Sequence, residues 1–390
     1  PRENDLILGT HGRSIWVLDD ITPIEKWSPD VAASDLTFFP PRPGITYHIA
    51  QRRWSAGQQV FAAKNPPYGA LLNYYLKDAI PPEPPRAEGE GPERPAGGGG
   101  ARSAAAEERP GAAAAQRKEG RVKISVYDKD GKLVREMDGP GAAGVNRTNW
   151  DLRWTPPAEP TPEQLQAVAA GFGFGPRGPL VEPGKYTIKI KAGAKEASQD
   201  LLVEEDPRVQ VSPEDRSARH DAVMKLYDMA KTADRDRRTI IGVRDALTAA
   251  REQWKQQGSR PGVVKIPEEI QKAAEELQKK VEAVAEKFAR PPQPLGNAGP
   301  PLEWKPDPLP NRVQELLQDL DGFDAAPGGQ QKDVLAELMP LVAEASAQVK
   351  KVVEEDLAAL NKKMNEAGIP HIVPAAAAPR QGRGGAENEP

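Results

Sequence analysis

Cysteine is absent from the 390-residue sequence, and only 5% of the residues are aromatic. Without cysteine the chain can have no disulfide framework, no thiolate zinc or iron–sulfur site and no cysteine nucleophile. The sequence also lacks any apolar run approaching the roughly 18 residues that a membrane-spanning helix needs, so we expect no membrane span. Basic residues are not in excess, because 53 lysines and arginines stand against 57 acidic residues, a net charge of −4. We therefore expect no binding to nucleic acid.

Proline is abundant instead, at 41 of 390 residues, about twice its usual share of roughly 5%. The mean hydropathy of −0.63 agrees with a chain rich in loops and linkers. A chain of this length is long enough for two or three domains, each with its own core. We therefore predict several small domains rather than one large one.

Residues 6–19, LILGTHGRSIWVLD, contain two apolar runs separated by a turn at His11, Gly12 and Arg13. This pattern predicts a β-hairpin. A two-stranded hairpin is only marginally stable alone in water, so we expect it to belong to a larger sheet encoded upstream. The sequence has no initiator Met, and we expect this chain to be the C-terminal portion of a longer protein.

The order Gly-Thr-His-Gly-Arg followed by Ile-Trp-Val-Leu-Asp-Asp resembles the closing strands of a blade in BNR-repeat, sortilin-type β-propellers of large bacterial exported proteins. Residues 360–370, LNKKMNEAGIP, are similar to the C-termini of the same family. The resemblance implies that residues 1–50 hold the last propeller strands and a connector. It also implies a secreted or cell-envelope (periplasmic) location.

Residues 51–80 together with 121–210 are predicted to form an antiparallel β-sandwich, because short alternating strands are separated there by turn residues. The clearest hairpin turns at Asp128–Gly131, after the alternating apolar residues Val122, Ile124 and Val126. Asp128–Val134, Trp150–Asp151 and Pro183–Tyr186 resemble the Ig-like module of the flagellar hook-capping protein family. The sequence departs from that family at Leu152, where a glycine is expected, and in an insertion from Thr155 to Val181.

Two segments are predicted to be disordered. In residues 81–120, 25 of the 40 residues are glycine, proline or alanine, and none is aromatic or β-branched. Such a segment cannot bury enough apolar area to offset its ordering entropy. The tail, residues 374–390, is similarly rich in small and polar residues.

Residues 211–373 show helical periodicity and are predicted to form a helical bundle, giving a multidomain α+β protein overall. Ser212 is the expected N-cap of a first helix that ends at Gly258, and a second helix should begin near Pro267. A short third helix should stop at Gly322. The last should run from about Gln331 to Ala367, with Pro340 kinking it or marking its start. Charged residues such as Glu275 and Lys279 are expected on solvated faces.

Candidate reactive groups are few. Four histidines, none with metal-ligand spacing, predict no metal site, and no cofactor motif is present: the glycine-rich run 171–178 lacks the strand and helix that a nucleotide loop needs. Asp19 and Asp20 are adjacent in an extended segment, so their side chains should diverge. The Glu204–Asp206 cluster is interpreted as a solvated sheet edge. We predict no catalytic residue.

His11 and Arg13 remain as candidate ligand-binding residues, because propeller loops commonly carry ligand contacts. The alternative is a structural hairpin turn. We expect a non-catalytic accessory and scaffold region that binds a protein or a glycan at the cell surface. The rival hypothesis is a sialidase-like glycoside hydrolase whose catalytic residues lie in an upstream propeller. A third is self-association through the apolar seams of the helical bundle.

Overall fold

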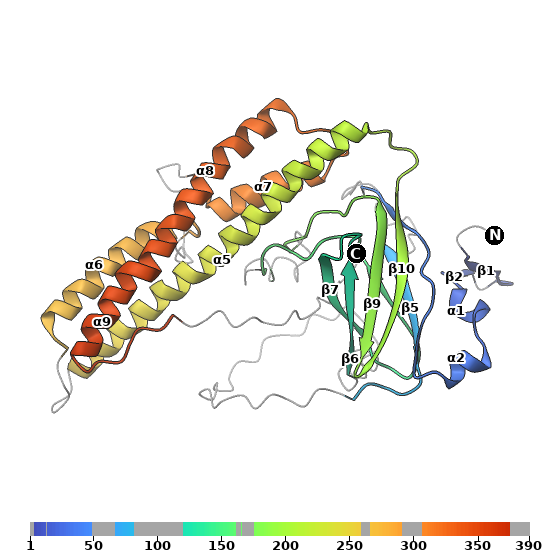
Figure 1. Ribbon diagram of the computed structural model, residues 1–390, viewed down its shortest axis with the longest axis horizontal. Coiled ribbons are helices and arrows are strands. Elements are labelled where there is room, and N and C mark those ends of the chain that lie inside the picture. Colours follow the sequence, from blue (N-terminus) through green and yellow to red (C-terminus); the bar gives the residue numbers. More distant parts are fainter. Residues whose placement is uncertain are drawn as a thin grey trace. The chain divides into compact units, whose positions relative to one another are not determined.

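The computed structural model describes residues 4–12, 14–48, 67–81, 120–160, 165, 175–258, 266–290 and 306–374. The predicted disordered segments lie outside these residues except at Pro81, Gly120 and Pro374. The described chain forms two compact units, one of β-sheets and one of helices, and is therefore mixed α+β (Figure 1). The β-sheet unit contains Pro1–Arg153 and Val181–Asp206, and the helical unit contains Trp154–Leu180 and Pro207–Arg383.

A five-stranded sheet forms the larger part of the β-sheet unit, in the strand order β4-β10-β9-β6-β7. Its strands are β4 (Gly44–Thr46), β10 (Lys195–Glu205), β9 (Gly184–Ala192), β6 (Arg121–Tyr127) and β7 (Leu133–Pro140). Neighbours are antiparallel except β4 and β10, which run parallel. The sheet therefore departs from the purely antiparallel arrangement that the sequence predicts.

The hairpin predicted at residues 121–137 is confirmed as β6 and β7. Val122, Ile124 and Val126 are fully buried along β6, as the period-two alternation requires. The Asp128 carboxylate accepts the backbone N–H groups of Asp130 and Lys132, at 3.0 and 2.8 Å, and so closes the turn.

A three-stranded antiparallel sheet has the order β3-β5-β8, with β3 (Leu36–Phe38), β5 (Ala70–Leu76) and β8 (Gly144–Trp150). It contacts the five-stranded sheet through aromatic side chains. The ring centroids of Trp150 and Tyr186 lie 5.4 Å apart, edge to face. The Tyr74 hydroxyl donates to the carbonyl oxygen of Pro140, on β7, at 2.5 Å. Segments 36–38 and 44–46, which the sequence places in a connector, thus supply strands β3 and β4.

Helices fill the second unit: α5 (Pro213–Gly258), α6 (Glu268–Ala285), α7 (Leu309–Asp321), α8 (Gly329–Lys351), a π-helix η1 (Val352–Leu357) and α9 (Ala358–Glu366). The Ser212 hydroxyl accepts the N–H of Asp215 at 3.0 Å, which confirms the predicted N-cap. The seam residues Leu226, Ile240 and Leu247 are fully buried inside the same chain. They are therefore not available to a second copy. No helix in the described part of the chain has the length and apolar character to cross a membrane.

The last helical segment differs from its prediction at two points. α8 begins at Gly329 and continues through Pro340, so the proline does not mark its start. The irregularity lies further on, at Val352–Leu357, where the backbone forms a π-helix before α9. Wide turns of this kind have no strong sequence signal.

Trp154–Leu180 belongs to the helical unit, although the sequence assigns this range to the sandwich. The Tyr227 hydroxyl of α5 donates to the carbonyl oxygen of Thr155 at 2.8 Å. The N–H of Leu180 donates to the Asp321 carboxylate of α7 at 2.9 Å. These bonds fix both ends of the segment on the helices.

Two buried tyrosines should make the β-sheet unit sensitive to alkaline pH. Burial raises the pKa of the Tyr74 and Tyr186 hydroxyls above the ordinary value of 10.0. Because the folded pKa is the higher one, the stabilisation is complete below pH 10 and is lost as the pH rises above it. The free energy of unfolding should then fall by about 1.4 kcal/mol per pH unit for each tyrosine.

Denaturant titrations from pH 8 to 11, followed by near-ultraviolet circular dichroism, measure this slope. The Tyr74→Phe variant should show a shallower slope than the unsubstituted chain. An unchanged slope in that variant would contradict the assignment to Tyr74.

Candidate functional site: an exposed apolar hairpin

The predicted N-terminal hairpin is confirmed as β1 (Leu6–Gly9) and β2 (Ile15–Leu18), which pair antiparallel. The register pairs Leu6 with Leu18, Ile7 with Val17 and Leu8 with Trp16. Because side chains alternate along a strand, each face of the hairpin carries its own apolar set. One face presents Leu6, Leu8, Trp16 and Leu18, and the other presents Ile7, Ile15 and Val17.

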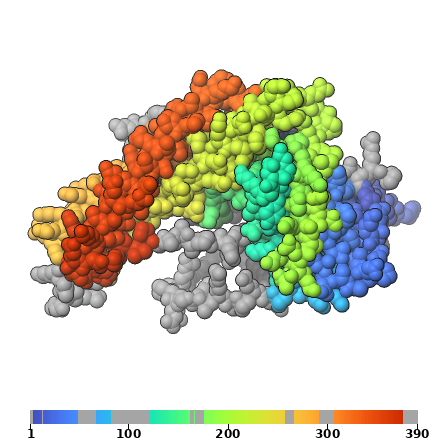
Figure 2. Space-filling view, in the orientation of Figure 1, coloured from blue at the N-terminus to red at the C-terminus, as the bar shows by residue number. Residues whose placement is uncertain are grey.

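All seven of these apolar side chains are exposed, from 40% for Leu6 to 71% for Ile15. Figure 2 shows the first residues, in the darkest blue, at the surface of the β-sheet unit. Within the described residues β1 and β2 form a two-stranded sheet in which each strand pairs with the other. Fully burying a side chain of this size stabilises a fold by about 1.5–3 kcal/mol. The hairpin is therefore suited to bind other β-strands at its edges and apolar surfaces on both faces.

The tip of the hairpin carries the predicted ligand-binding residues. His11 lies exposed in the turn, and Arg13 lies outside the described residues. The Thr10 hydroxyl donates to the carbonyl oxygen of Ser14 at 2.6 Å, which closes the turn. Gly12 and Ser14 have φ angles of 74° and 69°, in the left-handed region. Glycine adopts this conformation without strain, which explains its place in the turn.

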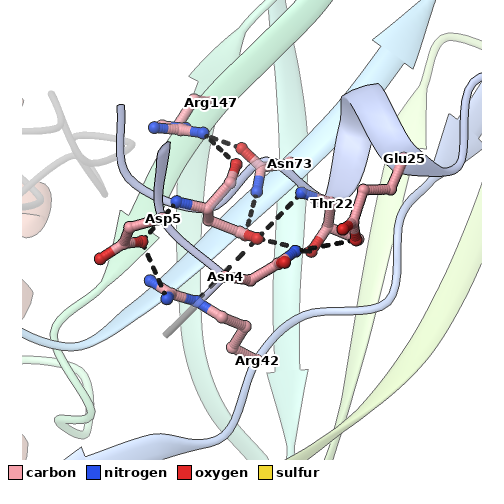
Figure 3. A network of polar contacts seen from close by, with 8 residues as sticks. Asn4, Asp5, Thr22, Glu25, Arg42, Asn73 and Arg147 are labelled. Carbon is pink, nitrogen blue, oxygen red and sulfur yellow. Dashed lines mark hydrogen bonds and ion pairs between the residues drawn. The ribbon is translucent and has the colours of Figure 1, made fainter. Parts of the chain in front are cut away.

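The base of the hairpin is held by a polar network around the buried Asp20, and Figure 3 labels the other residues of this network. Asp20 is only 1% exposed. Its Oδ1 accepts the Thr22 hydroxyl at 2.5 Å, and its Oδ2 accepts the Asn73 side-chain amide of β5 at 2.6 Å. The Arg147 guanidinium of β8 donates to the Asp20 carbonyl oxygen and to the Asn73 side-chain oxygen, both at 2.8 Å. Asp20 thus links the end of β2 to the three-stranded sheet.

The residues just before β1 join the same network. The Asp5 carboxylate accepts the N–H of Asp20 at 2.9 Å and forms an ion pair with Arg42 at 3.2 Å. The Asn4 side-chain amide donates to the Thr22 hydroxyl and to the Glu25 carboxylate, at 3.1 and 3.0 Å. Thr22 and Glu25 begin and end the short helix α1 (Thr22–Glu25). The chain is therefore anchored both just before β1 and just after β2, although the two strands are exposed.

The structure shows the surroundings of the acidic residues Asp19, Asp20 and Asp206, which the sequence offered as possible catalytic groups. Both oxygens of the Asp20 carboxylate are occupied and inaccessible, so this group is a poor general base. Asp19 is only partly buried. Asp206 is 6% exposed, and its N–H donates to the Thr46 carbonyl oxygen at 3.2 Å. The interpretation of Glu204–Asp206 as a solvated edge is therefore wrong for Asp206, because β4 covers that side of β10.

Histidines and acids do not converge elsewhere in the described ranges. No group of three or more of them, within those ranges, is placed to hold a metal ion. Residues 171–174 of the glycine-rich run lie outside the described residues.

Comparisons with protein-family models and with curated protein sequences find no match to this chain.

Proposed function

We propose that residues 6–18 are the closing hairpin of a β-propeller blade. The remaining chain is a non-catalytic accessory and scaffold region of an exported protein, which binds a protein or a glycan at the cell surface. In this proposal the two contacting sheets are an Ig-like sandwich. The resemblance of residues 6–20 to BNR-repeat, sortilin-type blades supports the proposal.

The observation that carries the proposal is the exposure of apolar side chains on both faces of a hairpin whose base is anchored. A hairpin that docks on one partner surface needs only one apolar face. A propeller blade lies between two neighbouring blades, so both of its faces are covered. The occupant we infer is accordingly a set of β-strands of the same polypeptide, which extends the hairpin into a blade.

Hydrogen exchange tests this proposal by comparing this chain with the full polypeptide that its gene encodes. In this chain we expect the outward-facing amides of β1 and β2 to exchange within seconds. In the full polypeptide they should be protected at least about 100-fold, because strands pair with them. Amides of β9, which pairs with a strand on each side, should be protected in both proteins.

Equal exchange of the hairpin amides in both proteins would contradict the proposal. A full polypeptide that contains no further strands would also contradict the proposal. A fluorogenic sialoside assay on the same two samples addresses the rival hypothesis. Hydrolysis by the full polypeptide alone would place a glycoside hydrolase in the propeller, while leaving the accessory role of this chain unchanged.

A further inference from the structure

The chain reverses direction after α9, and residues 369–372, which we call the strap, return to the helix that they follow (Figure 1). The reversal begins at Gly368, whose φ angle of 69° lies in the left-handed region that favours glycine. The N–H of Ile369 then donates to the carbonyl oxygen of Met364 at 2.8 Å and closes the last helical turn. The helix end itself therefore directs the strap back along α9.

Two of the four strap side chains are buried. Ile369 is 7% exposed and Ile372 is 5% exposed, and both belong to the apolar core of the helical unit. Pro370 and His371, which lie between them, are exposed, and Val373 after them is 72% exposed. The strap is therefore bound through two aliphatic anchors that are three positions apart.

Asn361 of α9 holds the backbone of the strap. Its side-chain amide donates to the carbonyl oxygen of Ile372 at 3.0 Å, and its side-chain oxygen accepts the N–H of the same residue at 2.9 Å. Asn361 is partly buried beside Leu360 and Met364, which are 3% and 1% exposed. An extended residue presents its N–H and C=O on one side, as it does to a neighbouring strand. Asn361 therefore binds extended backbone, whatever side chain that residue carries.

We propose that the surface covered by the strap, which we call the strap site, docks an extended peptide of a partner protein. This peptide carries two aliphatic residues three positions apart, and Asn361 binds the backbone of the second. The strap shows directly that a segment of this chemistry fits. The proposal concerns the helical unit alone and does not rest on the role proposed for the hairpin.

The strap competes with the partner for the strap site. Few contacts hold it, and segments of this kind open locally at a lower free energy than the whole fold. A short tether keeps its effective concentration at the site in the millimolar range, so a weakly binding peptide cannot displace it. A second copy of the chain gains nothing by exchanging straps, because each strap already occupies its own site. The occupant is therefore a segment of a different protein, and the strap sets the affinity that this segment must exceed.

Methyl NMR tests the proposal with the acetylated and amidated peptide Ile-Pro-His-Ile-Val, which copies residues 369–373. The receptor is the full chain carrying Ile372→Ser, a substitution that removes the second anchor of the strap. We expect saturable shifts at the methyls of Leu360 and Met364. The unsubstituted chain should bind the peptide at least about tenfold more weakly, because its own strap competes. Val373→Ser is the matched control at an exposed position and should bind as weakly as the unsubstituted chain.

Two further changes test how the peptide is recognised. Asn361→Ala, added to Ile372→Ser, should weaken binding at least about tenfold because two hydrogen bonds are lost. Asn365→Ala is its control and should leave the affinity unchanged, since Asn365 is exposed on the same helix. In the peptide, serine in place of the second isoleucine should abolish the shifts, whereas serine in place of the valine should not alter them.

Hydrogen exchange of the unsubstituted chain keeps the test independent of whether Ile372→Ser folds. The amide of Ile372 should exchange faster than that of Leu277, which is buried in α6, because the strap opens locally. The proposal is overturned if these two amides exchange at the same rate, if folded Ile372→Ser shows no saturable shift, or if Asn361→Ala leaves the affinity unchanged. A concentration-dependent dimer of the unsubstituted chain in sedimentation would also overturn it, because the strap of a second copy would then be the occupant.

Discussion

The Asp20→Ala variant should lower the free energy of unfolding of the β-sheet unit by about 3 kcal/mol, since the removal of one partner from a buried charged network leaves the others unsatisfied. The Asn73 amide and the Thr22 hydroxyl both lose their acceptor. Arg42, whose Nε lies 4.0 Å from Asp20 Oδ1, loses a second carboxylate. Urea titration followed by near-ultraviolet circular dichroism measures the loss.

The preceding residue provides the control for this prediction. Asp19 has the same side chain and is only partly buried, so Asp19→Ala should change the free energy of unfolding by less than about 0.5 kcal/mol. Equal effects of the two variants would show that the network does not stabilise the unit. Faster amide exchange in β1 and β2 of Asp20→Ala alone would show that the anchor also orders the hairpin.

The anchor was not predictable from the sequence, although the hairpin above it was. Strands β1 and β2 follow from a local pattern of apolar residues around a turn. The anchor joins Asp20 to Asn73 and Arg147, which are 53 and 127 positions away. A pattern of neighbouring residues cannot predict a contact between residues so far apart in the sequence. The left-handed conformation of Asp20, with a φ angle of 51°, is also rare enough that the pattern gives no hint of it.

In the helical unit, too, the features that depend on neighbouring residues were predictable, and those that depend on the packing of the folded chain were not. The Ser212 cap and the end of α5 at Gly258 are local signals, and both are found as predicted. Asp234 and Asp236 were expected on a solvated face, like other charged residues of the helices, but are 2% and 4% exposed. They lie on different sides of α5, because two residues along a helix differ by about 200°. Both carboxylates pair with arginines of the same helix, Asp234 with Arg237 and Arg238 and Asp236 with Arg235.

A second large effect is expected at Trp150, in the Trp-Asp strand that suggested the Ig-like module. Its side chain is fully buried and packs against Tyr186 of the other sheet, with ring centroids 5.4 Å apart. Its Nε1 donates to the carbonyl oxygen of Arg153 at 3.0 Å. Trp150→Ala removes both contacts and leaves a cavity between the sheets. The free energy of unfolding should fall by about 3–5 kcal/mol.

Val145 on the same strand is the control, because its side chain is 52% exposed. Val145→Ala should lower the free energy of unfolding by less than about 0.5 kcal/mol in the same urea titration. A small effect of Trp150→Ala would mean that the two sheets do not share a core, and Tyr186 would then be expected to tolerate alanine as well. A large effect at Trp150 with none at Val145 would show that the core between the two sheets stabilises the unit. The exposed apolar faces of the hairpin would then not be needed for this stability and would remain available for binding.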